Sequence, residues 1–175
     1  MAIQGTGFSL DVTFKAEASL RTSTTQYMAV GMVPGTTTTE DYTVALCGFT
    51  AAALTAVAPA TVTAKFAIGI NQSYLSSGAL ECSVRLFGLS KAICAHSIGA
   101  GSWVIAYNGI STTVMAGKIQ QLLDGATATA YGMTATSQVT ILGRALESGS
   151  TNSVITIFLN PHLNDLSVVG SLTVT

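Results

Sequence analysis

The sequence predicts an all-β fold: a single-domain β-sandwich or small β-barrel with extended terminal arms and at most one short helix. Val, Ile, Thr, Tyr and Phe recur in short runs, and Gly, Ser and Asn separate these runs at about the spacing of turns in such folds. Residues Leu80–Leu86 alternate between apolar and polar side chains, which is typical of a half-buried strand.

Individual elements follow from local signals. Asn108-Gly109 stands between Trp103–Tyr107 and Ile110–Met115, and it predicts a type I′ hairpin because both turn residues accept positive φ. Ser153–Leu159 is a nearly continuous apolar run, compatible with a strand buried on both faces. Good helix formers cluster at residues 118–124, which predicts the one short helix. Further strands are predicted at Phe8–Phe14, Gln26–Val30, Tyr42–Leu46, Lys65–Ile70 and Val139–Ala145.

A chain of 175 residues is long enough for one domain with its own core. We expect an N-terminal arm at residues 1–15, a β core at 16–161 and a C-terminal arm at 162–175. Residues 47–64 and 124–138 are rich in Ala and Thr and weakly patterned, so they are predicted to form loops or irregular edge strands.

Charged residues make up only 9% of the chain, against about 25% in a typical domain, and the net charge is -1. A surface so poor in charge is poorly protected against association and suits a protein packed against neighbours. It carries no basic footprint for nucleic acid. The uncharged stretch after Asp41 is mostly Ala and Thr, so it predicts no membrane span, and Met1–Gly5 lacks the features of a secretory signal.

The search for catalytic chemistry predicts no enzyme, no cofactor and no metal site. The three cysteines, Cys47, Cys82 and Cys94, form neither a disulfide framework nor a zinc-binding spacing, and are expected to be unpaired and buried. His96 and His162 are far apart in sequence and the eight carboxylates are scattered. A hydrolase on a β scaffold would need a nucleophile and a base that the sequence does not place together.

Apolar residues in the arms and one aromatic in the core are the candidates for an interface. Trp103 is either an interface anchor or a core residue, and the sequence does not decide between them. Phe8 and Phe14 lie in the expected N-terminal arm, and Leu166 and Val168 lie in the apolar tail of the C-terminal arm.

A series of short motifs in a fixed order gives the chain a family resemblance. The series is Gly69-Ile70, the turn Ser77-Gly78, Val84-x-x-x-Gly88-x-x-Lys91, Ile98-x-x-Gly101-x-x-Val104, Gly143-Arg144-Ala145-Leu146-Glu147 and the closing run Val154–Leu159. Over residues 16–161, this order resembles the capsid decoration (head cement) proteins of tailed phages. Residues 47–64 and 116–138 depart from the pattern as added segments.

The resemblance implies a structural virion protein, made in the host cytoplasm, that binds and stabilises the outer surface of an assembled capsid. It implies the major capsid protein as partner and a homo-oligomer, with a trimer as one form. The alternative is another self-assembling phage component, such as a tail-tube, spike or fibre-base protein, because low charge and β-richness suit both.

Overall fold

The computed structural model describes residues 8–33, 42–47, 66–107, 115–122 and 138–165, and these form a single all-β domain, as predicted. Two short 3₁₀ helices, η1 (Ala18–Leu20) and η2 (Ser23–Thr25), are the helical elements of these ranges. The strands are β1 (Leu10–Ala16), β2 (Ala29–Met32), β3 (Thr43–Leu46), β4 (Gly69–Asn71), β5 (Glu81–Ile93), β6 (Trp103–Ala106), β7 (Ile119–Gln121), β8 (Gln138–Ala145) and β9 (Val154–Asp165).

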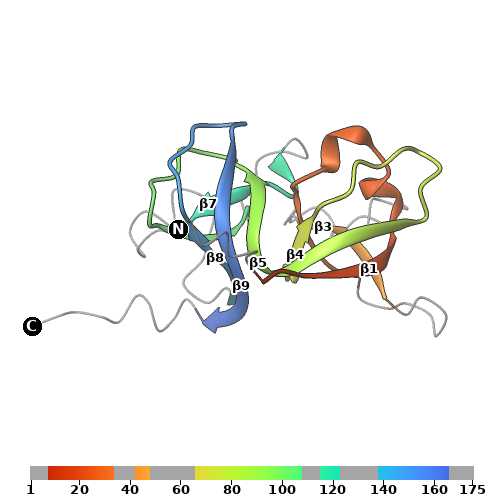
Figure 1. Cartoon of the computed structure of the whole chain (residues 1–175), viewed down its shortest axis with the longest axis horizontal. Helices are drawn as coiled ribbons and strands as arrows, with labels where there is room; N and C mark the ends of the chain where they lie inside the picture. The colour runs from red at the N-terminus through yellow and green to blue at the C-terminus, as the bar shows by residue number, and fades with distance from the viewer. Residues whose placement is uncertain (1–7, 34–41, 48–65, 108–114, 123–137, 166–175) are drawn as a thin grey trace, which may run out of the picture.

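Two closed rings of strands share the long strand β5. In the first ring the order is β1, β3, β2, β4 and β5, and β5 pairs back with β1. In the second ring β5 is followed by β9, β8, β6 and β7, and a bridge between Cys94 and Ile119 joins β7 to the end of β5. Figure 1 shows the two rings as two lobes, with β5 passing from one to the other. The barrel architecture is therefore the one observed.

Apolar side chains fill both rings. One core cluster lies in the first ring and includes Leu20, Val30, Val44 and Val84. The other combines residues of the second ring with first-ring residues such as Ile70, so the two rings share a buried boundary. This continuity makes the two lobes one domain.

The period-two pattern places each face of the long strands. In β5, Cys82 and Val84 are buried and Leu86 is partly buried, as the alternation predicted. Leu80 was expected on the same face, but it precedes the strand and is 64% exposed. In β9, Ile155, Ile157 and Leu159 are buried, whereas Val154 and Phe158 are exposed, so burial on both faces is wrong for this strand. Two of its outward positions, Val154 and Phe158, are apolar although they do not face the core.

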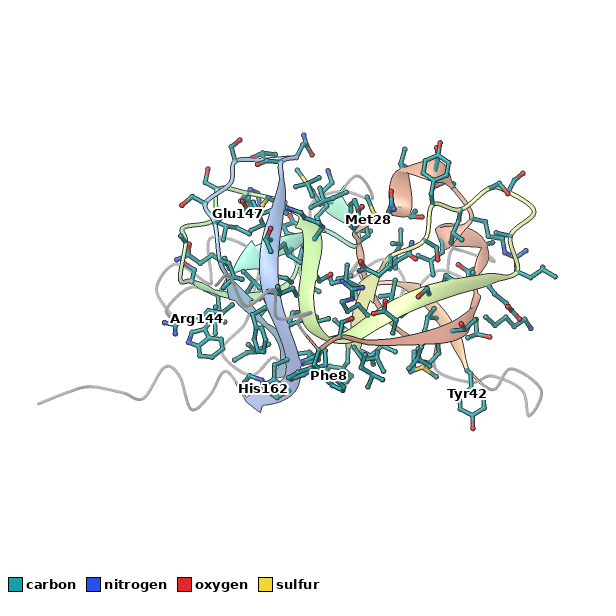
Figure 2. All side chains as sticks on the ribbon, in the orientation of Figure 1. Phe8, Met28, Tyr42, Arg144, Glu147 and His162 are labelled. Atoms are coloured by element: carbon teal, nitrogen blue, oxygen red, sulfur yellow. The ribbon has the colours of Figure 1, made fainter. Side chains whose placement is uncertain are left out.

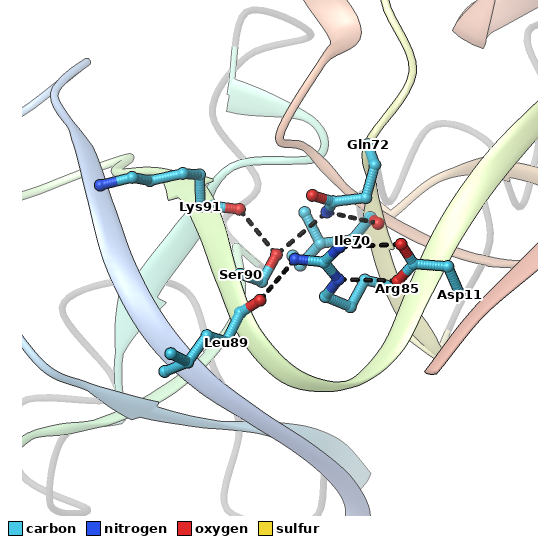
Figure 3. Close-up of polar contacts among 7 residues, drawn as sticks. All are labelled: Asp11, Ile70, Gln72, Arg85, Leu89, Ser90 and Lys91. Carbon is cyan, nitrogen blue, oxygen red and sulfur yellow. Dashed lines mark hydrogen bonds and ion pairs between the residues drawn. The ribbon is translucent and has the colours of Figure 1, made fainter. Parts of the chain in front are cut away.

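A bend at Gly88 lets β5 serve both rings. Gly88 has φ +98°, and a Cβ atom there would lie 2.4 Å from the carbonyl oxygen of Phe8. Only glycine accepts this conformation and this approach of the chain without strain. On the other side of the bend, Arg85 donates to both carboxylate oxygens of Asp11 at 2.7 and 2.8 Å, and to the carbonyl of Leu89 at 2.6 Å (Figure 3).

All three cysteines are free and buried. Desolvation raises the pKa of Cys82 to about 11 and also raises the pKa values of Cys47 and Cys94. Because the thiolate is the reactive form, burial keeps these thiols protonated and inert.

The structure corrects the predicted helix. Residues 118–124 were expected to be helical, but Ile119–Gln121 form β7, which pairs with β6. Ile119 is fully buried in the core of the second ring, and this burial outweighs the helix propensity of its neighbours.

Other predicted boundaries differ as well. The first strand of the predicted hairpin is β6, which pairs with β7 and β8. The turn Asn108-Gly109 lies outside the described residues. The sheet extends into both expected arms, because Leu10–Lys15 pair with β5 and β9 continues through Asp165. No helix in the described ranges is long and apolar enough to cross a membrane.

Gly88→Ala is expected to destabilise the fold by about 1–3 kcal/mol, because it combines an unfavourable φ with a backbone clash. Gly78→Ala is the matched control, since a Cβ atom at Gly78 would meet nothing within 4 Å. The control should change stability by about 0.5 kcal/mol or less. Urea denaturation followed by circular dichroism measures both, and equal midpoints for the two variants would contradict the role of Gly88.

The Asp11–Arg85 pair predicts a pH-dependent contribution to stability. The hydrogen bond from Arg85 lowers the pKa of Asp11 in the folded protein. The stabilisation is therefore fully present above the unfolded pKa of Asp and is lost as the pH falls through the lower folded pKa. Solvent screening keeps it at about 1 kcal/mol or less. Asp11→Asn should thus be less stable than wild type at neutral pH, and this difference should shrink as the pH falls below the unfolded pKa of Asp. A difference that is constant with pH in denaturation curves would refute the assignment.

Candidate functional site

An exposed row of large side chains crosses four neighbouring strands of the second ring. The strand register places Leu89 of β5 opposite Phe158 of β9, Phe158 opposite Arg144 of β8, and Arg144 opposite Trp103 of β6. Residues that are directly opposite on adjacent strands project from the same face of a sheet. Leu89 and Trp103 are each 46% exposed and Phe158 is 39% exposed.

Two more aromatic side chains, Phe87 and Phe8, extend this row towards the strands that close the first ring. Phe87 packs against Phe158 edge to face, with ring centroids 5.4 Å apart, and against Phe8 at 6.0 Å. Phe8 is 75% exposed and crosses beside Gly88, where the backbone allows its close approach. We name the set Phe8, Phe87, Leu89, Phe158, Arg144 and Trp103 the aromatic strip.

Trp103 is held in place by two polar neighbours. The guanidinium carbon of Arg144 lies 5.2 Å from the centroid of the indole ring. His162 approaches the same ring edge to face at 6.2 Å. Figure 2 shows Arg144 and His162 on the same lobe of the molecule. The Nε of Arg144 donates to the carbonyl oxygen of Gly101 at 2.7 Å, which fixes the orientation of the guanidinium. The indole is thus presented to solvent in a fixed setting.

The backbones of β8 and β9 approach each other closely at Gly143, next to Arg144 of the strip. A Cβ atom on Gly143 would lie 1.9 Å from the carbonyl oxygen of Phe158, so no other residue fits between the two strands. The register shifts between Ile141 and Gly143, as in a β-bulge. This irregularity immediately precedes Arg144 and sets the point from which its side chain leaves the sheet.

Most of the charge beside the strip is paired within the chain. Lys91 lies 3.3 Å from Glu147 and donates to the hydroxyl of Thr156 at 2.7 Å. Hydrogen bonds from Thr156, assisted by Lys91, lower the pKa of Glu147, so this carboxylate stays ionised at neutral pH. At the other end of the strip, Arg85 is paired with Asp11.

The motifs that carry the family resemblance meet around this face. Lys91 belongs to the Val-x-x-x-Gly-x-x-Lys motif, and Glu147, its partner, ends the Gly-Arg-Ala-Leu-Glu motif. The backbone amide of Gly101, from the third motif, donates to the carbonyl of Ala145. Residues far apart in sequence are therefore structurally coupled here, although sequence alone gave no reason for their spacing.

A second feature is an open cavity of about 350 Å³ at the boundary of the two rings, lined by Phe66, Ala67, Ile68, Thr140, Pro161 and His162. Its lining is mostly apolar. The buried hydroxyl of Thr140 has no hydrogen-bond partner among the described residues. In the same part of the chain there is no group of three or more His, Cys, Asp or Glu side chains that could hold a metal ion.

The structure separates the candidate interface residues predicted from sequence. Phe8 and Trp103 both belong to the strip, and Trp103 is exposed rather than part of the core. Phe14 packs against the core cluster of the first ring instead. Leu166 and Val168 lie outside the described residues.

Sequence reasoning missed four members of the strip: Phe87, Leu89, Phe158 and Arg144. Extending the period-two pattern along β5 and β9 would have indicated that Leu89 and Phe158 point outward. The pairing of β9 between β5 and β8, which unites the row, has no signal in a single sequence.

No protein-family model matches the chain, and no curated protein matches it in sequence. The structure is similar to the N base of head fiber gp8.5 of bacteriophage phi29, with a TM-score of 0.42 and 10% sequence identity, over 87% of this chain and 95% of that chain. A similarity of this size establishes neither a shared fold nor a residue correspondence.

Proposed function

We propose that this chain is a structural protein of a tailed-phage particle that binds the outer surface of the assembled capsid and stabilises it. The observation that carries the proposal is the aromatic strip, an exposed row of large apolar side chains on a face whose neighbouring charges are mostly paired. Rows of this kind mark binding surfaces more often than they serve a free monomer. The family resemblance supplies the capsid as the partner.

The composition agrees with binding by apolar contact. With seven basic and eight acidic residues in the whole chain, few ion pairs can form across an interface. Exposed ion pairs contribute about 0–1 kcal/mol each, whereas apolar burial contributes about 25 cal/mol per Å² before the costs of association. Aromatic side chains are the residues from which such interfaces draw most of their affinity.

Stabilisation of the shell then follows from linkage. A protein that binds the assembled shell but not its dissociated subunits raises the stability of the assembly by mass action. Many copies bound across seams between subunits would add their contributions. We include in the proposal that the chain acts without catalysis or cofactor, with the major capsid protein as partner and as a homo-oligomer on the shell.

Phe158→Thr is expected to weaken binding to undecorated capsids by about tenfold or more, because it removes the centre of the strip and keeps a strand-forming residue. Val154→Thr is the matched control: Val154 is also exposed on β9, but it pairs with Ile93 outside the strip. Co-sedimentation with purified empty heads measures both affinities. Equal binding by the two variants would remove the strip from the contact.

Wild-type binding should weaken little between low and moderate salt, because there is little charge to screen at this face. The same co-sedimentation assay across a salt series tests this. A steep loss of binding would contradict the contact chemistry. If no binding occurs under any condition, the capsid is the wrong partner, and co-assembly with tail or fibre-base proteins would then favour the alternative of another virion component.

A further inference from the structure

Arg144 is the charged member of the aromatic strip, and its setting differs from that of the nearby cations. Lys91 and Arg85 are paired with Glu147 and Asp11. Among the described residues, no acidic side chain forms an ion pair with Arg144. Within the part of the chain that the structure describes, the strip therefore carries one positive charge without an acidic partner.

The guanidinium of Arg144 is also oriented in advance. Its Nε donates to the carbonyl oxygen of Gly101, and its Cζ lies over the indole ring of Trp103. The hydrogen bond uses the Nε–H group, and among the described residues no acceptor is bound to the N–H groups of the two terminal nitrogens. A forked pair of donors fits both oxygens of a carboxylate.

The surroundings define what would bring that carboxylate. Trp103 and Phe158 flank Arg144 on neighbouring strands, both substantially exposed and apolar. A partner that covers the strip would bury Arg144, and a buried guanidinium without a counter-charge is costly. The complementary surface must therefore combine apolar side chains with one acidic group opposite Arg144.

We infer that Arg144 and Trp103 together form the anchor of the capsid contact, and that they receive an acidic side chain of the shell protein within an apolar patch. This inference rests on the proposed function and names the chemistry of its partner. Trp103 packs against the patch, while Arg144 binds the carboxylate in bidentate form. A single desolvated pair of this kind gives specificity without the strong salt dependence of a charged interface.

Arg144→Gln is expected to weaken binding to undecorated heads about tenfold to a hundredfold, because it leaves the partner carboxylate buried and unpaired. Arg144→Lys should fall in between, since it keeps the charge and loses the fork. Lys91→Gln is the matched control: it removes a cation from the same face that is already paired with Glu147, and should change the affinity about threefold or less. Thermal unfolding of each variant verifies folding.

Heads whose carboxylates have been amidated with carbodiimide and methylamine complete the test. Wild type should bind the amidated heads about as weakly as Arg144→Gln binds untreated heads. Amidation should lower the affinity of Arg144→Gln itself only slightly. Equal affinities of wild type and Arg144→Gln for untreated heads, or independent losses from variant and amidation, would overturn the inference.

Failure of the proposed function and failure of the Arg144 inference give different results. If wild type does not bind heads at all, the proposed function fails. If wild type binds, but Arg144→Gln changes self-association in sedimentation velocity and leaves head binding unaltered, the strip contacts a second copy of this chain and the inference is wrong.

Discussion

The structure depends on one strand that belongs to two closed rings. β5 contributes its first half to the ring with β1 and β4 and its second half to the ring with β9. A strand cannot follow both curvatures without a break in its regular geometry, and Gly88 provides that break. Arg85 spans the bend by binding Asp11 on one side and the carbonyl of Leu89 on the other. The position of the aromatic strip follows, because Phe8, Phe87 and Leu89 lie immediately around this bend.

Local patterns predicted the fold class and most strands, and failed where tertiary contacts decide. The alternation at Leu80–Leu86 correctly identified Cys82 and Val84 as buried positions of β5, whereas Leu80 precedes the strand and is exposed. Residues 118–124 resemble a helix only by propensity, and the demand for Ile119 in the core turns part of them into a strand. The closure of both rings involves contacts between distant segments, such as the bridge from Cys94 to Ile119, and no pattern in one sequence specifies them.

The candidate site was predictable only in part, because it also depends on contacts between segments that are distant in sequence. Phe8 and Trp103 were candidates for an interface from the sequence, whereas Arg144 appeared there only as part of the Gly143–Glu147 motif. Its significance appears only with the cross-strand register that places it between Phe158 and Trp103. Phe14, an equally good candidate in sequence, points into the first ring because β1 is part of the sheet rather than an arm.

Closure of the two rings of strands also affects the tendency of the chain to aggregate. A sheet with open edges exposes unpaired amide and carbonyl groups that can recruit strands from other molecules, and charged residues are the usual protection. This chain has few charges, but β1 pairs with β5 in one ring and β7 bridges to the end of β5 in the other. Among the described strands, β1 and β7 at the two ends of the sheet are thus both joined to β5 or the residue that follows it. The aromatic strip can then offer a side-chain surface for binding, while the described strands at the ends of the sheet offer little backbone template for polymerisation.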